Sequence, residues 1–122
     1  MNDCQTLSEA GHTVVRLAGE VDLSWSAQVR QAVLAALNGG GPVAVDLAAV
    51  RYIDSSGIAA LVEGFQNARG RGQRFVLVAV SAPVRSVVKL ARLDRVFEIH
   101  ESLEGGAPAG RRRLACWIAS AA

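Results

Sequence analysis

The pattern of hydrophobic and polar residues divides the chain into short segments of two kinds. Residues 12–18 are rich in β-branched side chains and follow a glycine, which predicts a strand, with residues 4–8 as a candidate partner strand. Apolar residues then recur at i, i+3, i+4 and i+7, which predicts a helix over about residues 26–37. Either Ser24 or Ser26 is suited to cap the start of this helix.

The same two patterns alternate through the rest of the chain. Residues 43–47 and 75–80 are apolar runs that predict buried strands, the second covered on both faces. Helical spacing over about residues 56–69 and a helix start at Ser81 separate these strands from a last short strand over 96–99. Helices that alternate with strands predict an α/β domain, in which helices pack on a largely parallel sheet.

Composition limits the function classes that need to be considered. The chain has 122 residues, of which 51% are hydrophobic and 20% charged, as expected for one folded domain. Of its net charge of +2, three positive charges come from residues 111–113, and the remainder has ten basic residues against eleven acidic ones. This balance opposes direct binding of nucleic acid, which would require a basic face.

The cysteines and the termini point to the cytoplasm. Cys4 and Cys116 show no metal-binding or CxxC spacing, so we expect reduced, structural thiols. The first ten residues lack the pattern of a signal peptide, and we expect no transmembrane segment, because no apolar run reaches the roughly 18 residues needed to span a bilayer.

Residues for catalysis are scarce. The two histidines, His12 and His100, fall near the ends of predicted strands, where we expect surface side chains. Nucleotide-binding glycine motifs, the HExxH zinc motif and the GxSxG elbow are all missing from the sequence. We therefore predict neither an enzyme nor a cofactor or metal site.

The turn Asp54-Ser55-Ser56-Gly57 stands between a predicted strand and a predicted helix. In one interpretation these residues only cap the helix. In the other, a serine at the tip of this turn is the substrate of a kinase, because a phosphate is tolerated at the positive end of a helix. The added charge would then repel a partner docked on the same surface. The residues alone leave both interpretations open, and they do not exclude each other.

The sequence resembles the STAS domains, and among them the bacterial anti-sigma factor antagonists. The resemblance is carried by "LAGEVDLSWSAQVR", by "VAVDLAAVRYIDSSGIAALVEGFQNARGRG" and by "APVRSVVKLARLDRVFEIHESLE". It implies a single STAS domain over residues 1–104 in the order β-β-α-β-α-β-α-β-α, with a mixed, mostly parallel sheet of about five strands and about four helices. Residues 105–122 would form a Gly/Pro-containing linker and an Arg-rich apolar tail.

The resemblance also implies a partner switch. The unphosphorylated protein would bind an anti-sigma factor that is a serine kinase and release the sigma factor. The kinase would phosphorylate Ser56, with Ser55 as the second candidate, and a PP2C-type phosphatase would reset the switch. The partner-binding residues implied by the resemblance are Asp22, Ser24, Asp54, Ser55, Gly57 and Ile58.

Two features depart from this family pattern. Trp25 stands where the family usually has a small residue or threonine, so it serves either partner choice or packing. The apolar spacing of residues 111–122 is compatible with a further helix, a dimer contact or a membrane-surface anchor. Two other STAS roles remain as alternatives, a cytoplasmic subunit of an ABC-type lipid transporter and a scaffold subunit of a stress-sensing assembly.

Overall fold

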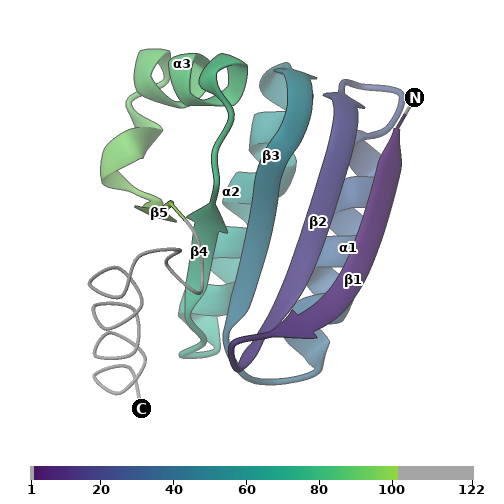
Figure 1. Cartoon of the computed structure of the whole chain (residues 1–122). Coiled ribbons are helices and arrows are strands. Elements are labelled where there is room, and N and C mark those ends of the chain that lie inside the picture. Colours follow the sequence, from purple (N-terminus) through teal and green to yellow (C-terminus); the bar gives the residue numbers. More distant parts are fainter. Residues whose placement is uncertain (1, 102–122) are drawn as a thin grey trace.

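The computed structural model describes residues 2–101 and shows one five-stranded sheet with helices (Figure 1). The strands are β1 (Asp3–Glu9), β2 (His12–Val21), β3 (Val43–Ile53), β4 (Phe75–Val78) and β5 (Glu98–His100). The helices are α1 (Ser26–Asn38), α2 (Ser55–Gly70), α3 (Ala82–Leu90) and the 3-10 turn η1 (Leu93–Arg95). Residues 105–122, with the predicted tail helix, lie outside the described residues.

The strands are arranged in sequence order, β1-β2-β3-β4-β5. The β1–β2 pair is antiparallel, and the other three pairs are parallel. The predicted α/β class with a mostly parallel sheet of five strands is confirmed. Within residues 2–101 the structure contains three α-helices, one fewer than the expected number of about four.

Helices α1 and α2 lie side by side on one face of the sheet (Figure 1). The predicted apolar face of α1 is confirmed, since Val29 and Val33 are completely buried. The corresponding face of α2 buries Leu61 completely, and Gly64 brings the two helices close together. A Cβ at Gly64 would lie 2.6 Å from Cγ1 of Val33. The main hydrophobic core therefore lies between this helix pair and the sheet.

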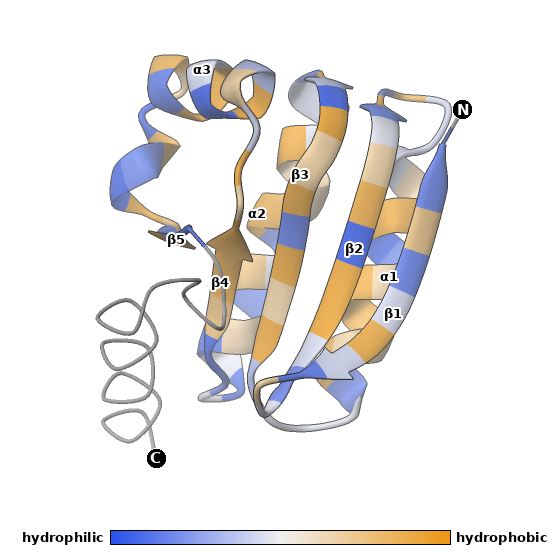
Figure 2. Cartoon of the chain, in the orientation of Figure 1, coloured by the Kyte–Doolittle hydropathy of each residue, from blue (hydrophilic) through white to orange (hydrophobic). Residues whose placement is uncertain are grey.

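Strand β4 is buried on both faces, as its continuous apolar sequence predicts. Figure 2 shows it as uniformly hydrophobic, whereas β1 alternates between polar and apolar residues. The predicted strand over residues 75–80 is two residues too long, because the structure ends β4 at Val78. Ala79 has a φ of 53°, a left-handed conformation that cannot continue an extended strand.

Strands β2 and β3 run further than the apolar pattern indicates. The prediction ended at residues 18 and 47, whereas the pairing continues to Val21 opposite Ile53. Register shifts along this pair interrupt the alternation of inward and outward side chains, so the sequence pattern weakens although the backbone bonds continue. The extension places the C-terminal ends of both strands beside the start of α2.

The prediction of a serine cap for α1 is wrong. Trp25 occupies the N-cap position and makes no capping bond with its side chain. The Ser24 hydroxyl donates to Asp22 instead, and the Ser26 hydroxyl lies 3.4 Å from the carbonyl oxygen of Leu23. The backbone carbonyl of Asp22 accepts hydrogen bonds from the amides of Trp25 and Ser26. The backbone of the loop therefore provides hydrogen-bond acceptors for these amides at the start of α1. Trp25 packs partly buried against the core.

The prediction that His12 is a surface residue is also wrong, because only 2% of it is exposed. His12 begins β2, and its Nδ1 lies 3.1 Å from the carbonyl oxygen of Ala10 in the preceding turn. Burial lowers the pKa of His12, which disfavours the charged imidazolium. His100 in β5 is half-buried, with Nε2 3.0 Å from Glu98.

Candidate functional site

Asp54 joins β3 to α2 and caps the helix. Its backbone is extended, with φ −112° and ψ −171°, and it is the N-cap residue of α2. Oδ1 of Asp54 accepts hydrogen bonds from the amide of Ser56 at 2.9 Å and from the amide of Gly57 at 3.1 Å. These donors would otherwise lack partners at a helix start. The capping interpretation of the turn therefore holds, with Asp54 as the capping side chain.

The two serines of the turn have different surroundings. Ser55 is exposed, whereas Ser56 is half-buried. The hydroxyl of Ser56 donates to Oδ1 of Asp54 at 2.5 Å. This bond is the main reason why the pKa of Asp54 is lowered, with smaller contributions from backbone amides. The Asp54 carboxylate is thus ionised at neutral pH and accepts three hydrogen bonds from the first turn of α2.

Gly57 allows α2 to begin directly against β2. A Cβ at this position would lie 2.6 Å from the carbonyl oxygen of Val21 and 2.7 Å from Cγ1 of both Val21 and Ile53. Only glycine fits at such a separation. The glycine of the motif is therefore explained by close packing, which fixes where Ser56 sits relative to the end of β2.

Asp22 and Ser24 lie in the adjacent loop. Val21 pairs with Ile53, and the amide of Asp54 donates to the carbonyl of Val21 at 3.2 Å, so the two loops leave the same edge of the sheet. Oδ1 of Asp22 accepts from the amide of Ser24 at 3.0 Å and from its hydroxyl at 2.6 Å. The predicted residues Asp22, Ser24 and Asp54–Gly57 are consequently brought together at one end of the molecule.

Ile58 has a different position from the other predicted residues. Only 8% of Ile58 is exposed, and its side chain belongs to the hydrophobic core. It can support the surface only from beneath. The exposed part of the first turn of α2 consists of Ser55 and Ala59.

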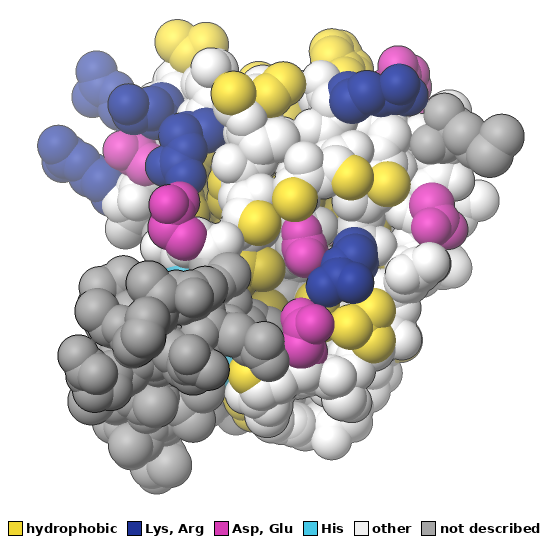
Figure 3. Space-filling model, viewed as in Figure 1, with side chains coloured by type: hydrophobic (Ala, Val, Ile, Leu, Met, Phe, Trp, Pro, Cys, Tyr) yellow, Lys and Arg dark blue, Asp and Glu magenta, His cyan; other side chains and the backbone are white. Residues whose placement is uncertain are grey.

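Sequence reasoning missed three exposed apolar side chains on the same end of the fold. Leu23 is 77% exposed in the loop before α1, and Tyr52 is 51% exposed near the end of β3. Leu90, at the end of α3, is 84% exposed. Leu23 and Tyr52 fall between the predicted strands and helices, and Leu90 falls in the helix predicted to start at Ser81, so the apolar pattern gave no signal that these side chains are exposed. Figure 3 shows basic side chains gathered around α3 and η1, beside this surface.

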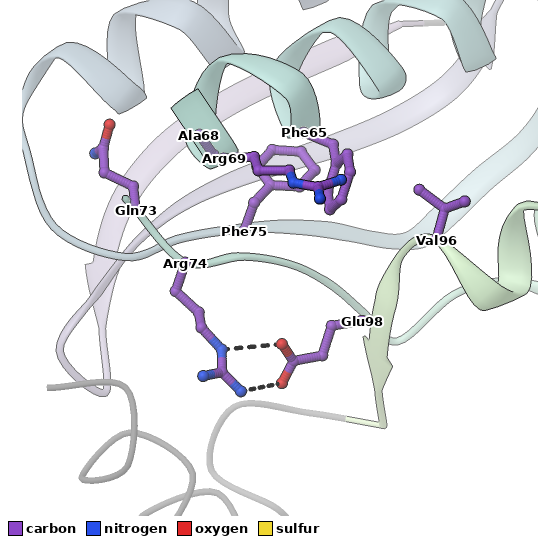
Figure 4. A pocket seen from close by; sticks show the side chains of 8 residues that line it. All are labelled: Phe65, Ala68, Arg69, Gln73, Arg74, Phe75, Val96 and Glu98. Atoms are coloured by element: carbon purple, nitrogen blue, oxygen red, sulfur yellow. Dashed lines mark hydrogen bonds and ion pairs between the residues drawn. The ribbon is translucent and has the colours of Figure 1, made fainter. Parts of the chain in front are cut away.

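A groove of about 420 Å³ lies at the other end of α2, as Figure 4 shows. Phe65, Ala68 and Arg69 of α2 line it, together with an ion pair between Arg74 and Glu98. Position 68 is twelve residues beyond Ser56, which corresponds to roughly 18 Å along a helix. The groove is therefore separate from the serine turn.

Within residues 2–101 the structure contains neither a candidate metal site nor a helix that could span a membrane. No group of three or more histidine, cysteine or acidic side chains within residues 2–101 could hold a metal ion. No helix in this part of the chain is long and apolar enough to cross a membrane. Cys4, the cysteine within the described range, is a free, half-buried thiol whose pKa is raised by burial.

Comparison with known proteins agrees with this fold. A family model described as "Mlab, STAS domain" matches residues 4–103. The anti-sigma-B factor antagonist of Listeria monocytogenes is 28% identical over 98 residues, which cover 80% of this chain and 85% of that protein.

Solved structures share the fold. The crystal structure of an anti-sigma factor antagonist from Mycobacterium paratuberculosis has a TM-score of 0.78 at 25% identity, over 91% of this chain and 95% of that one. The Bacillus cell fate determinant SpoIIAA in its phosphorylated form has a TM-score of 0.65 at 21% identity, over 84% of this chain and 94% of that one. This second likeness is one of fold alone.

Proposed function

The chain belongs to the STAS domain family, and we propose that it is an anti-sigma factor antagonist. The relative from Listeria with that function aligns over most of both chains. In its unphosphorylated form the protein binds an anti-sigma factor in the cytoplasm and thereby frees a sigma factor. The binding surface is the end of the fold formed by the loop after β2 and the start of α2.

We further propose that the anti-sigma factor is a serine kinase that phosphorylates Ser56. The observation that carries this proposal is the position of the Ser56 hydroxyl, which lies at the first turn of α2 and within 2.5 Å of Asp54. A phosphate at this position meets the positive end of the helix dipole, so the fold can tolerate it. A PP2C-type phosphatase removes it and resets the switch.

Phosphorylation changes the charge of the docking surface. It adds about 1.5 to 2 negative charges beside the Asp54 carboxylate and near the loop that contains Asp22. A partner that binds the neutral serine then faces a cluster of like charges. Such a cluster usually costs several kcal/mol of binding free energy. About 4 kcal/mol corresponds to roughly thousandfold weaker binding. In this proposal Ser24, Ser55 and Gly57 shape or line the same surface, and Ile58 supports it.

An affinity pull-down from the native cytoplasm tests the switch. Wild-type protein is compared with Ser56→Ala and Ser56→Asp, and bound proteins are identified by mass spectrometry. Ser8→Asp is the matched control, because it adds the same charge at an exposed serine on β1, away from the start of α2. We expect wild type, Ser56→Ala and Ser8→Asp to recover a serine kinase, and Ser56→Asp to lose it.

Other outcomes distinguish the alternative STAS roles. If all four proteins recover the same ABC ATPase and permease, the chain is a transporter subunit and Ser56 is only part of a helix start. If they recover further copies of STAS proteins in a large assembly, the scaffold role is correct. Retention of the kinase by Ser56→Asp would show that binding does not depend on the charge at this position.

A further inference from the structure

The groove at the far end of α2 has apolar walls that the core covers only in part. Phe65 is half-buried and Val96 is 41% exposed, so both leave apolar surface open to solvent. Ala68 and Phe75, which also line the groove, are almost completely buried. The volume of about 420 Å³ falls within the range of about 300 to 1,000 Å³ that is usual for sites of small ligands.

Aromatic rings give this groove a fixed shape. The chain has three phenylalanines, and all of them gather here. The rings of Phe65 and Phe97 meet edge to face with centres 5.8 Å apart, and the ring of Phe75 lies 6.4 Å from that of Phe97. Because Phe75 and Phe97 are buried, the apolar wall is formed by the packing of the core and needs no ligand to assemble it.

The charged groups of the groove leave one cation available. Nε2 of Gln73 donates to two backbone carbonyl oxygens, each at 2.9 Å. Arg74 donates to both carboxylate oxygens of Glu98, so these two charges neutralise each other. The side chain of Arg69 is exposed and has no hydrogen bond or ion pair within residues 2–101. The groove therefore has a net positive charge that comes from Arg69.

The place of Arg69 in the last turn of α2 has a simpler explanation, because a cation there interacts favourably with the helix dipole. The dipole does not account for the apolar side chains that line the same groove. A cation at the mouth of an apolar groove matches a ligand with an apolar body and one negative charge.

We propose that this groove binds a small apolar monocarboxylate, with its apolar body against Phe65 and Val96 and its carboxylate paired with Arg69. Figure 4 shows that Phe65 and Arg69 come from α2, whereas Val96 comes from the segment before β5, so the ligand bridges two elements of the fold. The groove is separate from the serine turn. The proposal therefore goes beyond the proposed function and holds whether or not Ser56 is phosphorylated.

NMR titration of the whole ¹⁵N-labelled chain tests the proposal, with octanoate and 2-naphthoate as probes. Octanoate has an aliphatic body and 2-naphthoate an aromatic one, so the comparison shows which body the groove prefers. The uncharged 1-octanol tests the need for the carboxylate. Arg69→Gln removes the cation from the groove. Arg85→Gln is the matched control, because Arg85 is also an exposed arginine but lies on α3, outside the groove.

We expect at least one carboxylate to shift the amide signals of Phe65, Arg69 and Val96 in a saturable way. Arg69→Gln should weaken its binding about fivefold, the scale of one exposed ion pair, and should leave the binding of 1-octanol unchanged. Arg85→Gln should bind both carboxylates as wild type does.

Three results would overturn the proposal. The first is the absence of saturable shifts with both carboxylates up to about 10 mM, a concentration at which even weak specific binding is visible. The second is a set of shifts that map to another part of the fold. The third is binding of the carboxylate by Arg69→Gln that equals wild type.

Discussion

Gly57 and Val21 lie so close together that a Cβ on Gly57 would be 2.6 Å from the carbonyl oxygen of Val21. An added Cβ could fit only if the start of α2 moved away from the end of β2. We predict that Gly57→Ala lowers the free energy of unfolding by about 1 to 3 kcal/mol, the usual cost of forcing extra atoms into a packed site. Urea unfolding and thermal melts measure this change.

Gly70 is the matched control in the same helix. A Cβ there would meet nothing within 4 Å, and its φ is not in the left-handed region. Gly70→Ala is therefore expected to be neutral or to stabilise the fold by about 0.4 to 1 kcal/mol. Equal destabilisation by both substitutions would show that helix position, and not the contact with Val21, decides the effect.

The prediction of the fold succeeded where burial leaves a regular pattern. Val29 and Val33 mark the core face of α1, and the four buried residues of β4 mark a central strand. The pattern failed where backbone pairing or a single dihedral angle decides the structure. The continuation of β2 to Val21 depends on pairing with β3, and the end of β4 depends on the left-handed conformation of Ala79.

For the candidate site, the sequence located the turn but not the contacts within it. Asp54 and Gly57 were expected among the partner-binding residues, and the structure shows that Asp54 caps the helix and that Gly57 packs against β2. The bond from the Ser56 hydroxyl to Asp54 has no sequence signal, because it depends on a side-chain conformation. The exposure of Leu23 has none either, since it arises from the course of one loop.

The cap formed by Asp54 predicts a specific pH dependence. Because the pKa of Asp54 is lowered in the folded protein, its stabilising effect is complete above the unfolded value, about 3.9 for aspartate, and is lost as the pH falls through the folded value. At pH 7, Asp54→Ala should lower the free energy of unfolding by about 1 kcal/mol. Urea unfolding of both proteins should show the same difference at pH 5 and a smaller one at pH 2.5. A difference that disappears between pH 7 and pH 5 would contradict this assignment.

The ion pair between Arg74, the residue before β4, and Glu98, the first residue of β5, consists of two hydrogen bonds. Nε and Nη2 of Arg74 donate to the two carboxylate oxygens at 2.9 and 2.7 Å, and both side chains are about 30% exposed (28% and 31%). Glu98→Gln should lower the free energy of unfolding by about 1 kcal/mol, because it removes the charge from a two-bond, partly buried contact.

The pair between Arg30 and Glu63 provides the comparison. It links α1 to α2 by a single bond of 2.7 Å between two exposed side chains. Solvent screens such pairs, so Glu63→Gln should leave the unfolding transition unchanged within error. Equal effects of Glu98→Gln and Glu63→Gln in parallel urea titrations would contradict the distinction between the two pairs.

Finally, the position of Ser56 predicts that the switch acts on binding and leaves the fold intact. Ser56→Asp places a negative charge at the N-terminus of α2, where the helix dipole favours it, but next to the Asp54 carboxylate, which opposes it. Because these effects oppose each other, we expect the melting temperature to stay within about 5 °C of wild type, which corresponds to about 1 kcal/mol for a domain of this size. Differential scanning calorimetry checks this, with Ser8→Asp as the surface control. If Ser56→Asp melted more than 10 °C below that control, a loss of partner binding would reflect unfolding rather than charge repulsion at the docking surface.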